Sequence, residues 1–116
     1  MEQFVTLDLP PALALDALTL ELEHSAIPSN QVLIGSPTTG HAELRPGFGV
    51  WEHTPGVSTD VESDELFVVL VGAATVEFDD GHPPLVLSAG TIARLSSGMR
   101  TTWTVTETLR KVYWTA

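Results

Sequence analysis

Glu65 is the residue of this sequence whose type and position most directly suggest chemistry. It precedes a run of apolar residues, and three of them share its phase: Phe67, Val69 and Val71. Alternate side chains of a strand share a face, so Glu65 is expected to point with them into the interior. A carboxylate there is costly unless it is paired, hydrogen-bonded or protonated. Glu65 is therefore a candidate general acid or base, or one metal ligand; the alternative is a structural acceptor for loop N–H groups or for Arg94.

His53 is a candidate partner for Glu65. It follows Glu52 in an expected strand, so the two side chains face opposite ways and only one of them lines an interior pocket. If His53 faces inward, its imidazole joins Glu65 as an acid/base pair near neutral pH; otherwise it lies at the rim. The other histidines are expected on the solvated surface or, for the first of them, equally at a subunit contact: His24, His41 and His82.

Thr101, Trp103 and Arg94 are candidates for binding a ligand. Residues 101–108 alternate strictly, which places Thr101 and Trp103 on the inward face of a strand. Trp103 is first of all expected as core mass, and the alternative is that it forms an aromatic wall of the pocket. Arg94 is expected either to meet an acidic ligand or to form a salt bridge at the surface or between subunits.

Short strands must position these residues. From about residue 31 onward, turn signals recur about every 8 to 12 residues, the pattern of an all-β sandwich or barrel. The run 66–71 is apolar throughout and predicts a strand buried on both faces. A length of 116 residues suffices for one domain and not for two. The expected strands are 32–34, 48–53, 66–71, 74–78, 85–87, 91–95, 101–108 and 111–114.

Residues 1–30 differ from the rest of the chain. Pro10 and Pro11 interrupt the backbone, residues 12–18 are compatible with one or two turns of helix, and residues 18–23 alternate like a strand. Neither piece buries its apolar side by itself. We therefore predict a short N-terminal arm, residues 1–30, that packs on a barrel formed by residues 31–116 or on a partner subunit.

The charge balance restricts the partners. Five Lys/Arg against fifteen Asp/Glu give a formal net charge of −10, which repels a phosphate backbone or an anionic membrane surface. Asp60, Glu62 and Asp64 crowd together and are expected in a solvated loop. There is no cysteine, hence no thiolate site or nucleophile. With no basic leader and no apolar run of roughly 20 residues, we expect a cytoplasmic protein without nucleic-acid or membrane partners.

Several motifs occur in the order and spacing of one known fold family. Glu65 precedes Gly72 by seven positions, and Gly90 lies six positions before Ser96-Ser97-Gly98; the flanking segments 49–56 and 110–113 follow the same order. Residues 31 to 116 thereby resemble the small single-domain cupins related to ureidoglycine aminohydrolase, formerly a family of unknown function. The resemblance implies an all-β, antiparallel jelly-roll barrel, commonly a homodimer, with a pocket open at one end.

The resemblance also indicates where metal-binding cupins carry histidines. The two histidines of the first motif fall at Ser58 and Asp60, or at Thr59 and Val61, and that of the second falls at Thr101. None of these residues supplies an imidazole, and a lone carboxylate does not hold a transition metal tightly. We therefore expect no tightly held metal and no cofactor.

The fold restricts where a site lies but not which reaction occurs there. The leading hypothesis is a homodimeric barrel that binds a small polar metabolite in a pocket lined by Glu65, Thr101, Trp103 and either His53 or Arg94. One alternative is a hydrolase or isomerase acting on a small nitrogen- or carboxylate-bearing metabolite, like the ureidoglycine relative, with Glu65 moving the proton. The other is a non-catalytic accessory or interaction module.

Overall fold

The computed structural model describes residues 5–6 and 8–115, with side chains from residue 8 onward. The all-β prediction is confirmed, and no helix of the described residues is long and apolar enough to cross a membrane. Among the described residues there is one 3-10 turn, η1 (Ser29–Gln31). The strands are β1 (Val5–Thr6), β2 (His24–Ala26), β3 (Val32–Ile34), β4 (Thr38–Arg45), β5 (Phe48–His53), β6 (Gly56–Val61), β7 (Glu65–Phe78), β8 (Leu85–Leu87), β9 (Ile92–Leu95) and β10 (Arg100–Thr115).

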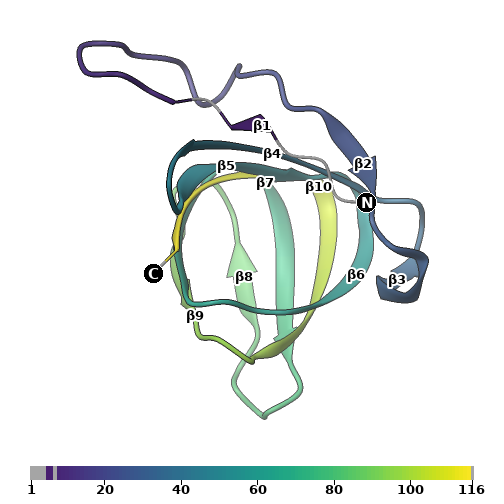
Figure 1. The fold of residues 1–116 in the computed structure, drawn as a ribbon. Coiled ribbons are helices and arrows are strands. Elements are labelled where there is room, and N and C mark those ends of the chain that lie inside the picture. Colours follow the sequence, from purple (N-terminus) through teal and green to yellow (C-terminus); the bar gives the residue numbers. More distant parts are fainter. Residues whose placement is uncertain (1–4, 7, 116) are drawn as a thin grey trace.

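The two longest strands of the barrel, β7 and β10, pair with each other in antiparallel orientation. They pair from Thr101 opposite Phe78 to Thr115 opposite Glu65. The first part of β10 also pairs with β6 and its last part with β5, while β8 and β9 pair with β7. Because one strand changes partners along its length, the sheet curls around an interior, as the ribbon shows (Figure 1).

Gly72 bends β7 in its middle. It has a φ of +104°, and a Cβ at this position would lie 2.1 Å from the carbonyl oxygen of Thr108, so only glycine fits. The pairing with β10 shifts register around this point, as in a β-bulge. The inward phase changes from Phe67 and Val69 before the bend to Ala74 and Val76 after it. The expected strands 66–71 and 74–78 are therefore one bent strand.

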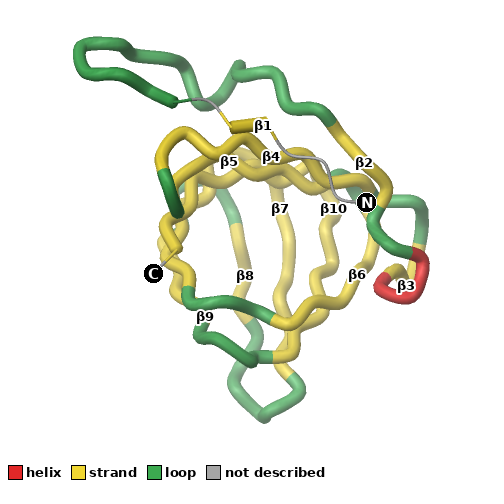
Figure 2. The backbone as a smooth tube through the Cα atoms, in the orientation of Figure 1, coloured by secondary structure: helices red, strands yellow, loops and turns green. Residues whose placement is uncertain are grey.

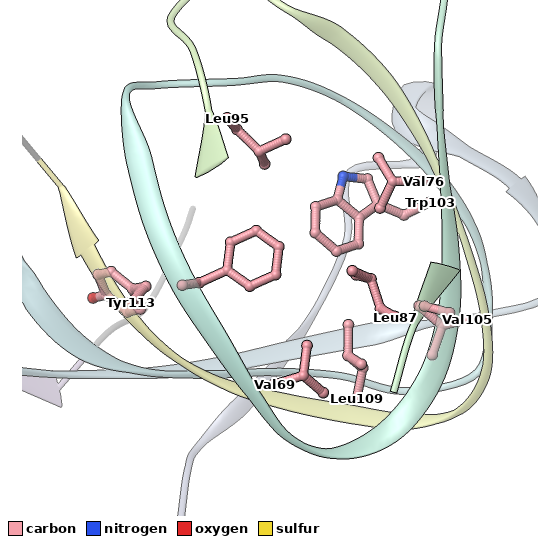
Figure 3. Close-up of a cluster of buried hydrophobic side chains, with 10 residues drawn as sticks. Val69, Val76, Leu87, Leu95, Trp103, Val105, Leu109 and Tyr113 are labelled. Atoms are coloured by element: carbon pink, nitrogen blue, oxygen red, sulfur yellow. The ribbon is translucent and has the colours of Figure 1, made fainter. Parts of the chain in front are cut away.

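Apolar side chains fill one end of the barrel. Val76, Leu87, Leu95, Trp103 and Leu109 are among the buried residues of this cluster, and Figure 3 shows them converging on the interior. The prediction that residues 66–71 are buried on both faces is wrong. Leu66, on the outer face, is 46% exposed and Val71 is 47% exposed. Val71 does not share the inward phase of Phe67 and Val69 as expected, because a register shift pairs it with the outward-facing Arg110.

The described part of the N-terminal arm lies on the side of the barrel where β4 lies (Figure 2). β2 pairs with β4, and the amide of Leu9 donates to the carbonyl of Leu44. The segments proposed as helix, 12–18, and as strand, 18–23, instead contain only isolated turns, and the arm's strand in this part is β2. β4 and β6 are further strands that the sequence pattern did not predict. Polar residues and glycine outnumber the apolar residues in both, which have only Ala42 and Leu44 in β4 and Val57 and Val61 in β6.

Candidate functional site

Beside the apolar cluster the barrel holds an open cavity of about 800 Å³, and Trp103 and Tyr113 belong to both. Side chains of β4, β5, β6 and β10, the residues that lead into β7 and the chain around β2 and η1 line it. We call the most buried part of this lining, where His53 and Lys111 lie, the floor of the cavity. Inward residues of a strand recur at every second position. Three pairs of side chains that line the cavity follow this rule: His41 and Glu43 on β4, Trp51 and His53 on β5, and Lys111 and Tyr113 on β10.

Lys111 is the central side chain of the cavity floor and is the only lysine of the sequence. Its side chain is 5% exposed and donates a hydrogen bond to the Glu65 carboxylate. Its Nζ lies 4.4 Å from the ring centroid of Trp51, 4.3 Å from that of Phe67 and 5.1 Å from that of Trp103. Carboxylate and ring faces together compensate the lost hydration of the ammonium group.

Sequence reasoning missed Lys111 because lysine is almost never fully buried unless it is paired. Two signals could have found it. Lys111 is an even number of positions from Trp103, the residue predicted to face inward, and the chain has no other lysine. The cation expected in this place was Arg94. Of the two possibilities for Arg94, a ligand contact or a position at the surface, the structure shows the second: Arg94 is exposed on β9, opposite Leu66, and is absent from the cavity lining.

Glu65 lines the cavity, with 14% of its side chain exposed. The partner that the structure gives its carboxylate is Lys111, rather than the loop N–H groups or Arg94 considered from the sequence. An ammonium group held against a carboxylate and three aromatic rings is a preorganised charged pair at the bottom of an open cavity. Such a pair exchanges a proton with a bound ligand without prior rearrangement.

His53 faces inward and is 2% exposed. Its Nδ1 lies 2.6 Å from the carbonyl oxygen of Thr54, which can only accept, so Nδ1 carries the proton. Nε2 is then the acceptor for the Ser58 hydroxyl at 2.8 Å. Burial lowers the pKa of His53, and the positive charge of Lys111 acts in the same direction. His53 is thus a neutral imidazole whose two nitrogens are both bonded to protein groups.

Glu52 faces the opposite way, as its position next to His53 requires. Its carboxylate accepts from Arg110 Nε at 3.0 Å and lies 2.6 Å from His24 Nε2. Burial alone would raise the pKa of Glu52, but the hydrogen bonds from Arg110 and His24 lower it below its usual range. Arg110 also donates to the carbonyls of Ala17 and Leu20. This cluster fastens the arm to the outside of the barrel and does not belong to the cavity.

Glu62 is a buried carboxylate of the site, so its expected place in a solvated loop is wrong. It accepts from Thr101 Oγ1 at 2.5 Å and from Trp103 Nε1 at 3.0 Å. Thr101 and Trp103 therefore hold an acid in place, and Trp103 also forms part of the cavity wall. Neighbouring Asp60 lines the cavity too. Desolvation and the charge of Glu62 raise the pKa of Asp60 to about 6.

His41 also lines the cavity, so the expectation of a solvated surface histidine is wrong. It lies on β4 directly across from Trp51, and its Nε2 is hydrogen-bonded to the Tyr113 hydroxyl. Burial raises the pKa of Tyr113 to about 12, and the negative charges of Glu43 and Glu65 contribute. The sequence placed His41 in a loop because strand β4 was not recognised.

The donor set does not fit the metal site of histidine-bearing cupins. Of the residues at the expected ligand positions, Ser58 is bonded to His53 and Thr101 to Glu62. The Glu65 carboxylate is bound to an ammonium group. Within residues 8–115, no three His, Asp or Glu side chains gather in an arrangement that could hold a metal ion. The charged centre of this cavity is instead the Lys111–Glu65 pair.

Comparison with known proteins places this geometry in a family. Residues 45–113 match the model of the EutQ-like cupin domain. No curated protein matches the sequence. A EutQ protein of Clostridium difficile is similar in structure, with a TM-score of 0.67 and 18% identity over 88% of this chain and 84% of that chain.

Two proteins of unknown function have similar structures. A DUF861 protein of Pseudomonas syringae has a TM-score of 0.73 and 22% identity over 88% of this chain, and this chain covers 46% of its length. A DUF1255 protein of Acidithiobacillus ferrooxidans has a TM-score of 0.58 and 19% identity, over 78% of this chain and 84% of that one. At these identities the likeness shows a shared cupin fold.

Proposed function

Because this chain belongs to the family of EutQ-like cupin domains, we propose that it binds a small polar metabolite in the open end of its barrel. The observation that carries the proposal is the cavity of about 800 Å³ with the Lys111–Glu65 pair at its floor. Ligand pockets of small molecules typically measure about 300–1,000 Å³ and present a few fixed polar groups among apolar walls. Here Trp51 and Trp103 supply the walls.

The open cavity also favours binding over a purely structural barrel. An apolar cluster that includes Leu87, Leu95 and Leu109 stabilises the barrel, and the cavity lies beside it. An accessory module without a ligand needs no such polar cavity. We therefore rank the non-catalytic interaction module below the binding protein.

A thermal-shift screen of small polar metabolites tests this proposal. A compound at about 100 times its Kd stabilises the folded state by about 2.7 kcal/mol, which is easily measured as a rise in Tm. Glu65→Gln should reduce the rise, because it removes one charge of the cavity floor. Arg94→Gln is the matched control, since Arg94 is exposed outside the cavity. If no compound raises Tm, or if both variants respond like the parent, the proposal fails.

The proposed binding does not use a tightly held metal. Elemental analysis after dialysis against a weak chelator is expected to give far less than one Fe, Mn, Zn or Ni per chain. A value near one per chain would overturn this part of the proposal. Glu65→Gln would then show whether the carboxylate is a ligand, through loss of the bound metal.

The second candidate function is that of an enzyme, a hydrolase or isomerase of a small nitrogen- or carboxylate-bearing metabolite. It follows from the resemblance of the sequence to the cupins related to ureidoglycine aminohydrolase. Its support is the presence of Glu65 and His53 in one cavity. Turnover that Glu65→Gln abolishes and Arg94→Gln leaves intact would establish it. Binding without any chemical change in the compound would reject it.

We also propose a homodimer. The outer faces of β7, β9 and β10 expose neighbouring apolar side chains: Leu66 lies opposite Trp114, and Ile92 opposite Val68. A second copy of this face would cover them with a self-complementary surface. Sedimentation should show a dimer that Ile92→Lys dissociates, while Leu13→Lys, on the exposed arm, leaves it intact. A monomer at micromolar concentration would contradict the proposal.

A further inference from the structure

The position of Lys111 calls for an explanation beyond stability. Lysines ordinarily lie at the surface, yet the only lysine of this chain is at the bottom of the barrel cavity. Replacing a buried ion pair by apolar side chains of similar volume is often neutral or even stabilising. The fold therefore does not need an amine and a carboxylate here. A lysine that lines a cavity among aromatic rings, with a carboxylate placed to take its proton, supplies the nucleophile and the base that imine formation with a carbonyl uses.

We propose that Lys111 forms an imine with the carbonyl carbon of a small aldehyde or ketone in the cavity. The proposal rests on the binding function above, because it names the class of ligand for the same cavity. It assigns Lys111 as the nucleophile and Glu65 as the group that moves its proton.

The step balances with these two residues alone. Glu65 takes one proton from the Lys111 ammonium group, and the neutral amine forms a C–N bond to the carbonyl carbon. The resulting carbinolamine loses its oxygen as water, which carries away two of the three ammonium protons. The third stays on the nitrogen of the iminium, so ammonium plus carbonyl gives iminium plus water. Glu65 returns to the carboxylate form.

The surroundings of Lys111 suit the product as well as the reactant. The iminium keeps the single positive charge where the ammonium carried it, against the Glu65 carboxylate and beside the rings of Trp51 and Phe67. The same contacts therefore stabilise both ends of the step. Water is restricted at this site, since the lysine side chain is 5% exposed, and restricted water slows hydrolysis of the imine.

The other charged groups of the cavity restrict the class of ligand further. Three more acidic residues, Glu43, Asp60 and Glu62, line it, and Lys111 is its single Lys or Arg side chain within the described residues. A negative charge on the ligand would meet these carboxylates, while the only Lys or Arg of the cavity is engaged by Glu65 and by the imine itself. The site therefore favours an uncharged aldehyde or ketone over a 2-oxo acid.

Reductive trapping tests the proposal on the folded protein. Glycolaldehyde with sodium cyanoborohydride converts an imine into a stable hydroxyethyl amine, and peptide mapping locates it. The chain offers two kinds of amine, its N-terminal amine and Lys111, so the assignment is unambiguous. We expect native Lys111 to be labelled faster than Nα-acetyl-lysine, and we expect glycolaldehyde to be favoured over pyruvate by a larger factor at Lys111 than with Nα-acetyl-lysine.

Two variants separate a nucleophile from a structural lysine. Lys111→Arg should abolish internal labelling while the N-terminal amine still reacts. Glu65→Gln should slow labelling of Lys111 by about 100-fold, the lower range for a positioned general base, with the N-terminal rate unchanged. Far-UV circular dichroism confirms that each variant is folded, and the peptide map of the parent protein decides the question even if one is not.

Labelling of Lys111 only after unfolding in urea would overturn the proposal and leave a structural ion pair. A factor between glycolaldehyde and pyruvate that is no larger at Lys111 than with Nα-acetyl-lysine would overturn the preference for uncharged ligands. If compounds without a carbonyl raise Tm in the screen while Lys111 stays unlabelled, the imine is rejected and the binding function stands.

Discussion

Removing the ammonium group of Lys111 should lower the free energy of unfolding more than removing the charge of its partner Glu65. Lys111→Met keeps a long, unbranched side chain among the same rings, so the space stays largely filled. The Glu65 carboxylate, 14% exposed, loses the cation that the structure places against it. Glu65→Gln is the opposite perturbation and leaves the ammonium group with the rings of Trp51, Phe67 and Trp103.

The two variants should therefore differ in free energy of unfolding. Leaving one member of a buried pair alone costs about 3–5 kcal/mol, and the partial exposure of Glu65 places Lys111→Met near the lower end, about 3 kcal/mol. Each ring contact of an ammonium group is worth about 0.5–2 kcal/mol, so the Glu65→Gln protein retains much of its compensation. We expect a cost of about 1–2 kcal/mol for it.

Urea denaturation of the parent, both single variants and the double variant measures these values. At a slope of about 1.5 kcal/mol per molar urea, Lys111→Met should lower the midpoint by about 2 M. The double variant should be more stable than the sum of the single effects by about 1–3 kcal/mol. Arg45→Met is the matched control. It breaks the exposed ion pair with Asp8 and should cost about 0–1 kcal/mol.

A Lys111→Met protein as stable as the parent would refute this reasoning. So would additive single effects, because they would show that the two charges do not interact. A larger loss for Glu65→Gln than for Lys111→Met would mean that the aromatic rings contribute little to holding the ammonium group.

Three further predictions concern the neighbourhood of the cavity. Trp103→Phe removes the indole donor to the buried Glu62 carboxylate and should cost about 1–3 kcal/mol in urea denaturation; an unchanged midpoint would contradict the hydrogen bond. Gly72→Ala should destabilise the fold far more than Gly81→Ala, since both have a positive φ but only the first would press a Cβ into the β10 backbone; equal Tm losses would deny the close approach. Because burial lowers the pKa of His53, its contribution to stability is present above the ordinary imidazole pKa of 6.5 and is lost as the pH falls through its folded value; His53→Gln should flatten the pH dependence of stability in this range, and a parallel loss in both proteins would count against it.

The barrel could be predicted from local sequence patterns, because the alternation of inward and outward side chains along a strand depends only on neighbouring residues. Trp103 belongs to a short alternating segment, and its inward side followed from that segment. For His53 the sequence left open whether it or Glu52 faces inward, and the structure decided for His53. The motifs around Glu65 and Gly72 identified the fold family. Strands β4 and β6 were not predicted because they contain few apolar residues. A strand that is held mainly by backbone hydrogen bonds to its neighbours need not have the composition that is typical of strands.

The identity of the site's partners lay beyond the sequence. Glu65 and Lys111 are 46 positions apart, and Glu62 meets Thr101 and Trp103 only because β10 folds back against the segment after β6. Such contacts depend on how strands that are distant in the sequence pair with each other. Bulges shift the register of this pairing, and the bend at Gly72 reverses which residues of β7 face inward. The sequence thus determined a barrel with an acid inside it, whereas the tertiary structure decided that a lysine, and not Arg94, neutralises that acid. The physical reason is that alternation is a property of one strand, while charge compensation depends on which strands the curled sheet brings together.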